Sequence, residues 1–209
     1  MLSSDLARRL ELTITDPAAL PRDVHKAAAD AMEHGLAAIA VTPAYTARVA
    51  TMLRGSGVRL VTVVGHPAGT HKPTLKAIEA TSTLKDGADE IDVTPFRPNL
   101  LTNQFDAARA ELLEIVRAAR STRRDARVTV TIDPAAATDP AIELACRAAR
   151  ESGCDAVKIA ADSLRRLKPH AAGLVVKTTL ENTAAAESLL AAGADLLCAT
   201  SAVILNETV

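Results

Sequence analysis

The stretch Gly153-Cys-Asp-Ala-Val-Lys-Ile-Ala160 carries the chain from the end of a helical pattern into a strand pattern. Glycine is a common residue just after the last turn of a helix. The residues that follow alternate, with Val157 and Ile159 on one face and alanine or lysine on the other, which is typical of a β-strand. The same turn recurs as Gly87-Ala-Asp89 and Gly193-Ala-Asp195. A helix, a glycine turn and a strand, repeated along the chain, indicate parallel strands joined by crossover helices.

Eight strand-like runs alternate with longer, alanine-rich helical runs. We expect strands at residues 10–15, 37–42, 59–65, 89–94, 127–132, 155–160, 173–178 and 195–200, and helices near 21–34, 44–55, 71–86, 104–121, 139–152 and 182–192. The connection after the sixth strand holds at most a brief helix, and few residues follow the eighth. The predicted fold is an α/β protein of the (β/α)8 TIM-barrel class, with shortened C-terminal βα units, in a single domain over residues 1–209. The alternative is an open, doubly wound sheet.

The two faces of the predicted strands favour the closed barrel. An open sheet with helices on both faces buries aliphatic residues on both, whereas these strands have one aliphatic face and one small, polar or charged face. We expect the aliphatic set to face the helices: Leu10, Leu12, Ile14, Ile39, Val41, Val61, Val63, Ile91, Val93, Val128, Val130, Ile132, Val157, Ile159, Leu174, Val176 and Leu197. We expect the other set to point into the barrel: Glu11, Thr13, Ala40, Thr42, Thr62, Val64, His66, Asp92, Thr94, Thr129, Thr131, Asp133, Ala156, Lys158, Ala160, Lys177, Thr179, Cys198 and Thr200.

Composition argues against several classes of protein. Hydrophobic residues make up 48% of the chain and charged residues 23%, which is a globular balance, and no apolar run suggests a membrane span or a signal peptide. The net charge of −1, with basic residues spread along the chain, argues against a nucleic-acid surface. We therefore expect a cytoplasmic protein that binds neither nucleic acid nor membrane. The three cysteines lack C-x-x-C spacing, so we expect reduced core thiols and no metal site.

Three charged residues share the inward face near the carboxyl ends of the strands, where barrel enzymes place their chemistry. They are Asp92, Lys158 and Lys177, in the fourth, sixth and seventh strands. Two cations in a pocket of low dielectric repel, so we expect Lys177 to lower the pKa of Lys158 toward neutrality. A neutral amine attacks a carbonyl group and forms a Schiff base, whose iminium withdraws electrons from the adjacent C–C bond. Asp92 is placed to move protons through a water molecule. The alternative is a buried ion-pair network with a structural role only.

The order of several motifs resembles that of the deoxyribose-phosphate aldolase family. The matching segments are 10–15 (LELTIT), 61–70 (VTVVGHPAGT), 86–93 (DGADEIDV), 152–161 (SGCDAVKIAA), 173–179 (GLVVKTT) and 192–201 (AGADLLCATS). The resemblance runs over nearly the whole chain. It implies a class I aldolase without a metal or other cofactor, in which Lys158 forms the Schiff base, Lys177 is the second lysine and Asp92 relays protons. Glu11 stands where the family has an aspartate.

Two segments depart from the family pattern. In the family, a Gly-Gly turn follows the second lysine, and its backbone amides hold the substrate phosphate. Here residues 178–183 (TTLENT) contain no glycine, and Glu181 adds a negative charge. After Lys158, the family's Thr-Ser-Thr-Gly becomes residues 159–162 (IAAD), and Cys198 replaces a glycine in the last strand. The resemblance with these departures implies retained Schiff-base chemistry and an altered phosphate site.

We therefore expect a carbon–carbon lyase that makes or cleaves a bond of a small aldehyde or ketone, other than the usual phosphorylated deoxysugar. Lys158, Lys177, Asp92 and Glu11 would carry the reaction. Candidate substrate contacts are Thr42, His66, Asp133, Thr179, Thr200 and Ser201. The thin C-terminal shell is compatible with a homodimer. Two alternatives stay open: a non-catalytic binding or scaffold protein that has lost the phosphate site, and another Schiff-base enzyme such as an isomerase.

Overall fold

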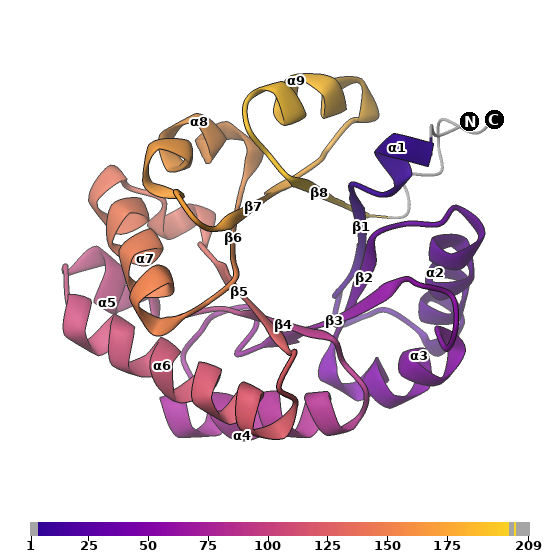
Figure 1. Ribbon diagram of the computed structural model, residues 1–209, viewed down its shortest axis with the longest axis horizontal. Coiled ribbons are helices and arrows are strands. Elements are labelled where there is room, and N and C mark those ends of the chain that lie inside the picture. The colour runs from indigo at the N-terminus through magenta and orange to yellow at the C-terminus, as the bar shows by residue number, and fades with distance from the viewer. Residues whose placement is uncertain (1–3, 201–202, 204–209) are drawn as a thin grey trace.

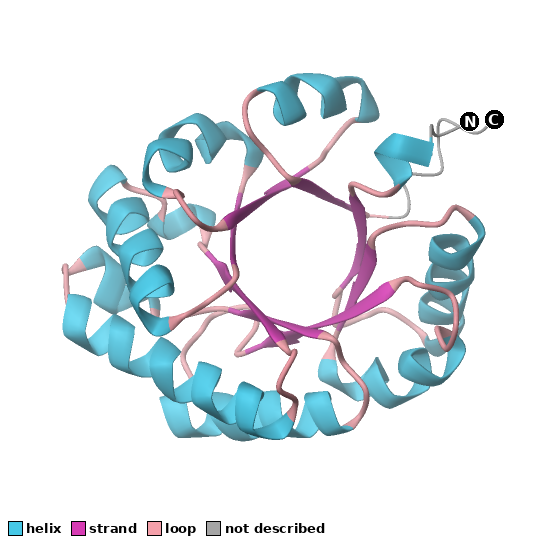
Figure 2. Cartoon of the chain, in the orientation of Figure 1, coloured by secondary structure: helices cyan, strands magenta, loops and turns pink. Residues whose placement is uncertain are grey.

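The chain forms a closed barrel of eight parallel strands in a computed structural model that describes residues 4–200 and 203 (Figure 1). The strands are β1 (Leu10–Ile14), β2 (Ala38–Val41), β3 (Arg59–Val64), β4 (Glu90–Val93), β5 (Arg127–Thr131), β6 (Ala156–Ile159), β7 (Val175–Thr179) and β8 (Leu196–Ala199). Each strand pairs with the next along the chain, and β8 pairs with β1. Figure 2 shows the strands as an inner ring with the helices outside it. The predicted (β/α)8 TIM barrel is confirmed, and the open sheet is excluded.

The helices that surround the barrel differ in length. They are α1 (Ser4–Ala7), α2 (Pro21–Glu33), α3 (Thr46–Met52), α4 (Pro73–Lys85), α5 (Arg97–Leu101), α6 (Phe105–Thr122), α7 (Asp139–Ser152), α8 (Leu164–Leu167) and α9 (Ala186–Ala191). Figure 1 shows the long α4, α6 and α7 outside the middle strands, and the short α8 and α9 beside β6 to β8. The predicted shortening of the C-terminal βα units is therefore confirmed. The short α5 was not predicted; proline in its first turn favours a helix start there.

The glycine–x–aspartate turns end a helix and fix the start of the next strand. Their glycines, at positions 87, 153 and 193, have positive φ angles of 108°, 80° and 102°, which glycine adopts without strain. Each aspartate side chain accepts a 2.8 Å hydrogen bond from a backbone N–H of the preceding strand, and its own N–H donates to the carbonyl of that same residue at 2.8 Å. The pairs are Asp89 with Leu60, Asp155 with Val128 and Asp195 with Val176. The starts of β4, β6 and β8 are thereby held in register.

The faces of the strands agree with the prediction except in β3. There Val61 packs with Ala38 and Ala40 in a small apolar cluster inside the barrel. Thr62 faces outward instead, because its hydroxyl lies 3.0 Å from that of Thr46 on α3 and is satisfied there. Val64 joins the outer core. The predicted faces of β3 are therefore wrong and must be exchanged. Valine occurs on both faces of this strand, so apolar character could not show which face points into the barrel.

Two further predictions concern the cysteines and membrane-spanning helices. Cys146, Cys154 and Cys198 are free and buried, as expected. Within the described part of the chain, no helix combines the length and the apolar character that a membrane crossing needs.

Candidate functional site

Charged side chains occupy the middle of the barrel, where layers of branched aliphatic side chains usually pack. Glu11 and Lys177 come from odd-numbered strands and form one layer, with Thr129 of β5. Asp92 and Lys158 come from even-numbered strands and form the next layer toward the carboxyl ends. Glu90 lies one layer toward the amino ends, two residues before Asp92 on β4. Three carboxylates and two ammonium groups therefore share the barrel interior.

Glu11 lies between the two lysines and contacts both. Its Oε1 is 3.3 Å from Lys158 Nζ, and its Oε2 is 2.6 Å from Lys177 Nζ. Lys158 Nζ is also 3.0 Å from Asp92 Oδ2. The structure therefore brings together the four residues expected to carry the reaction, with a carboxylate bridging the two amines.

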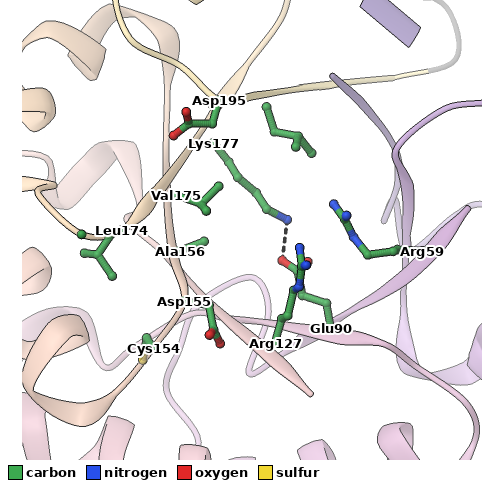
Figure 3. Close-up of a pocket in the computed structure, with 12 residues that line it drawn as sticks. Arg59, Glu90, Arg127, Cys154, Asp155, Ala156, Leu174, Val175, Lys177 and Asp195 are labelled. Carbon is green, nitrogen blue, oxygen red and sulfur yellow. Dashed lines mark hydrogen bonds and ion pairs between the residues drawn. The ribbon is translucent and has the colours of Figure 1, made fainter. Parts of the chain in front are cut away.

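Each lysine has a second carboxylate partner that a threonine orients. Thr131 donates a hydrogen bond to the other oxygen of Asp92. Lys177 Nζ is 2.5 Å from Glu90 Oε1, the contact drawn as a dashed line in Figure 3, and Thr129 donates to that same oxygen at 2.6 Å.

The two lysines differ in access to solvent. The Lys158 side chain is 12% exposed, whereas that of Lys177 is 2% exposed. Lys158 is therefore the more accessible of the two amines.

The carboxylates set the protonation of the site. Burial alone would raise the pKa of Glu11, but the charges of Lys177 and Lys158 and hydrogen bonds from Lys177 and Cys198 lower it to about 2. Burial alone would lower the pKa of Lys158, but the negative charges around it, Asp92 foremost, raise that pKa well above its ordinary value. The pKa of Lys177 is raised as well: burial opposes the shift, and Glu11 and Glu90 cause it.

These directions overturn one expectation. Lys177 does not bring the pKa of Lys158 toward neutrality in the free protein. The physical reason is that three carboxylates surround the two ammonium groups, so that attraction outweighs the repulsion between the cations. Lys158 is therefore an ammonium group at neutral pH when the site is empty of substrate.

A cavity of about 480 Å³ opens at the carboxyl ends of the strands, and we call it the mouth. Its lining includes Thr13, Lys158, Thr179, Glu181, Cys198 and Thr200. A second hollow of about 390 Å³ shares Thr13 and Thr200 and adds Asp16 and Asp23. Among the described residues that line the two hollows, Lys158 is the one cation. The Thr13 hydroxyl is buried without a hydrogen-bond partner in the described part of the chain, and Thr13 lines both hollows.

The expected substrate contacts fall into three groups. Thr179 and Thr200 line the mouth, and Thr179 Oγ1 also accepts a hydrogen bond from Ala161 N at 3.1 Å. His66 is exposed on the loop after β3. The pKa of His66 is lowered, first by partial burial; the charge of Lys158 lowers it further, and the charge of Asp92 opposes the shift. That response places His66 within electrostatic reach of the site.

The other expected contacts do not reach the two hollows or cannot be placed. Thr42 is partly buried before the 3-10 turn at Pro43–Tyr45 and lines neither hollow. Asp133 uses both carboxylate oxygens within the protein, accepting from Ala135 N at 2.8 Å and pairing with Arg97 at 2.9 Å. Ser201 lies outside the described residues.

Glu90 was not among the predicted site residues, and neither Thr13 nor Thr131 was among the expected catalytic residues or substrate contacts. A signal for Glu90 was present, because it stands two residues before Asp92 and so shares its inward face. No such signal marks Thr13, since its unpaired hydroxyl depends on the packing of neighbouring strands. Within the described ranges, no cluster of three or more His, Cys, Asp or Glu side chains has the arrangement of a metal site.

Several known proteins similar to this chain are deoxyribose-phosphate aldolases. No protein-family model matches it. The chain is 34% identical over 153 residues to deoxyribose-phosphate aldolase of Streptococcus suis (strain 98HAH33). The aligned region covers 73% of this chain and 68% of that aldolase. It is 33% identical over 154 residues to deoxyribose-phosphate aldolase of Enterococcus faecalis (strain ATCC 700802 / V583), covering 74% and 69%.

Solved structures extend the similarity over nearly the whole fold. The tetrameric deoxyribose phosphate aldolase from Aeropyrum pernix superposes with a TM-score of 0.88 at 29% identity, covering 98% of this chain and 91% of that one. The aldolase QR15 superposes with the same TM-score of 0.88 at 23% identity, covering 98% and 95%. At that lower identity, the second match supports the fold alone.

Proposed function

This chain belongs to the deoxyribose-phosphate aldolase family and is a carbon–carbon lyase, and from that premise we propose that Lys158 carries its reaction as a Schiff base. One observation carries the proposal. Lys158 lines the mouth, and its amine lies 3.0 Å from Asp92. A nucleophile, a partner that can take its proton and a cavity for a carbonyl compound therefore meet at one point.

Formation of the Schiff base begins with a proton transfer. The raised pKa of Lys158 makes it an ammonium group at rest, so binding must be accompanied by loss of a proton to Asp92. The free amine attacks the carbonyl carbon, a C–N bond forms, and the carbonyl π electrons pass to oxygen, which takes a proton. The nitrogen then loses its second proton, and the hydroxyl leaves as water with a proton from Asp92. The product is an iminium ion on Lys158.

Cleavage follows from the electron demand of that iminium ion. A base takes the proton of the hydroxyl on the carbon beyond the scissile bond, and a carbonyl forms there. The electron pair of the C–C bond moves toward the iminium carbon and gives an enamine. The enamine takes a proton on carbon, and water releases the product from Lys158. Thr131 keeps Asp92 oriented toward the amine through these steps. Glu11 and Lys177 stay paired and hold the electrostatic balance of the interior.

The substrate we propose is a small carbonyl compound without a phosphate group. Phosphate sites need cationic side chains or free backbone amides. The lining of the mouth and of the adjoining hollow offers acids, Glu181, Asp16 and Asp23, and one cation, Lys158, which the reaction itself uses. The hydroxyl groups of Thr13, Thr179 and Thr200 suit hydroxyl and carbonyl oxygens instead.

Borohydride trapping tests the Schiff base. The protein is incubated with acetaldehyde, reduced with borohydride and measured by intact mass and peptide mapping. We expect one ethyl group on Lys158, no adduct at that position in Lys158→Met, and unchanged trapping in Lys26→Met, which removes an exposed surface lysine. The absence of any adduct with acetaldehyde or pyruvate would contradict the proposal and would favour the binding-protein alternative.

Product analysis tests the substrate. Cleavage of 2-deoxyribose is compared with cleavage of its 5-phosphate at equal ionic strength. We expect kcat/KM for the phosphorylated sugar to exceed that for the free sugar by less than about tenfold, because the mouth lacks a phosphate site. A preference for the phosphate of about a thousandfold would refute this part and leave the Schiff-base proposal intact. An isomerised product without cleavage would indicate a different Schiff-base reaction.

A further inference from the structure

The amino end of the barrel holds a cavity larger than the mouth. Its volume is about 770 Å³, and it is lined by residues at the starts of β3 to β8. Figure 3 shows Arg59 and Arg127 extending into it from β3 and β5, beside the contact between Lys177 and Glu90. Its volume falls in the range of small-molecule sites, roughly 300–1,000 Å³.

Neither arginine has a side-chain partner among the described residues. Among the described residues, no ion pair or side-chain hydrogen bond joins either guanidinium to another group, and Arg59 Nε is buried without a partner. A buried donor without a partner is uncommon in folded proteins. Arg127, by contrast, is exposed at the rim and is free to move toward a ligand.

The acidic residues of this cavity already have partners. Glu90 is paired with Lys177 at 2.5 Å. Asp155 accepts from Val128 N and pairs with Arg120, and Asp195 accepts from Val176 N. Arg59, Arg127 and Asp195 are therefore the charged groups of this lining that no ion pair among the described residues neutralises, and two of the three are cations.

From this arrangement we propose that the amino end of the barrel binds a small molecule that carries oxyanion groups, a phosphate ester or a polycarboxylate, between Arg59 and Arg127. A guanidinium group presents a planar fork of N–H donors that matches the two oxygens of a carboxylate or phosphate. The two forks come from strands of the same parity, separated only by β4, so both reach one ligand. The layer of Glu11 and Lys177, with Glu90 in the layer next to it on the amino side, separates this site from the mouth, so the proposal does not depend on the reaction at Lys158.

Isothermal titration of the full chain with inorganic phosphate and, separately, with citrate tests the site, with ionic strength held constant by sodium chloride. We expect saturable binding of one molecule per chain for at least one of the two anions, and the tighter one identifies the ligand class. Arg59→Gln and Arg127→Gln should each weaken binding by about tenfold or more, because each removes charged hydrogen bonds. Arg48→Gln removes the same charge from the exposed face of α3 and should leave binding unchanged.

Three results would overturn the proposal. They are no binding of either anion, binding that both arginine variants retain in full, and binding that Lys158→Met abolishes, which would place the anion in the mouth. Thermal unfolding of each variant shows that it is folded. Arg127 is exposed, so Arg127→Gln keeps the test decisive even if Arg59→Gln does not fold.

Discussion

Replacing Glu11 with glutamine should move the reactivity of Lys158 to lower pH. Glutamine has nearly the same shape and still accepts a hydrogen bond from Lys177. Lys177 keeps Glu90 as its ion-pair partner, and Lys158 keeps Asp92. In the wild type, three carboxylates face two ammonium groups; in the variant, two face two. The change therefore removes negative charge without leaving a buried cation unpaired.

The size of the shift follows from the geometry. A carboxylate and an ammonium group 3.3 Å apart attract by about 5 kcal/mol at an effective dielectric constant of about 20. Lys177, 2.6 Å from the other oxygen, already neutralises part of that charge, so the effect on Lys158 is smaller. We therefore expect the pKa of Lys158 to fall, by less than the full attraction would give.

The rate of Schiff-base formation reports this pKa, because only the unprotonated amine attacks. A raised pKa means that the rate climbs as the pH rises toward it, and a lower pKa moves the whole profile to lower pH. The assay is the initial rate of cyanoborohydride trapping of acetaldehyde between about pH 6 and about pH 10. Glu90→Gln is the matched control, since Glu90 contacts Lys177 and not Lys158, and its profile should move less. A Glu11→Gln profile that coincides with that of the wild type, or lies at higher pH, would refute the reasoning.

Four other predictions concern single groups. Asp92→Asn should slow trapping at Lys158 by about a hundredfold or more, because the proton acceptor is lost even as the lysine pKa falls; stopped-time intact mass measures it, and an unchanged rate would remove Asp92 from the mechanism. Because the pKa of Glu11 is lowered from its ordinary value of 4.5, Glu11 stabilises the folded state at pH values above 4.5. This contribution, on the order of 3 kcal/mol, should be lost as the pH falls toward about 2. Urea unfolding of wild type and Glu11→Gln along an acid series should therefore converge, and a constant difference would contradict this. Cys198 has its pKa raised, first by burial and then by Glu11, so iodoacetamide should leave it unmodified at neutral pH until urea unfolds the chain. Asp195→Ala should lower the free energy of unfolding by about 1–2 kcal/mol, since a backbone N–H of β7 loses its acceptor, and no change in urea unfolding would argue against the turn's role.

The fold could be predicted because its signals are repeated. Glycine turns, strand-like runs and helical runs recur along the chain, so an error in one unit does not change the architecture. The reversed face of β3 shows the limit. Valine occupies both parities there, and the outward Thr62 depends on meeting the hydroxyl of Thr46, a contact that the sequence does not reveal.

The residues of the site were largely predictable, but their protonation was not. Parity along the strands placed Asp92, Lys158 and Lys177 together. The sign of the Lys158 pKa shift depends instead on the balance of burial against every charge within reach, and Asp92 and Glu11 raise that pKa more than burial lowers it. Burial and charge act in opposite directions on such groups, so their balance requires distances. The cytoplasmic location and the homodimer stay predictions.

The glycine–x–aspartate turns make strand placement independent of helix length. The turn before β8 follows a helix of 6 residues, and the turns before β4 and β6 follow helices of 13 and 14 residues. All three nevertheless deliver the next strand through the same pair of 2.8 Å hydrogen bonds. A βα unit of this barrel can therefore shorten on the outside while the positions of Asp92, Lys158 and Cys198 on the inside do not shift. Trimming of the outer helices and preservation of the interior chemistry are, in this chain, separable events.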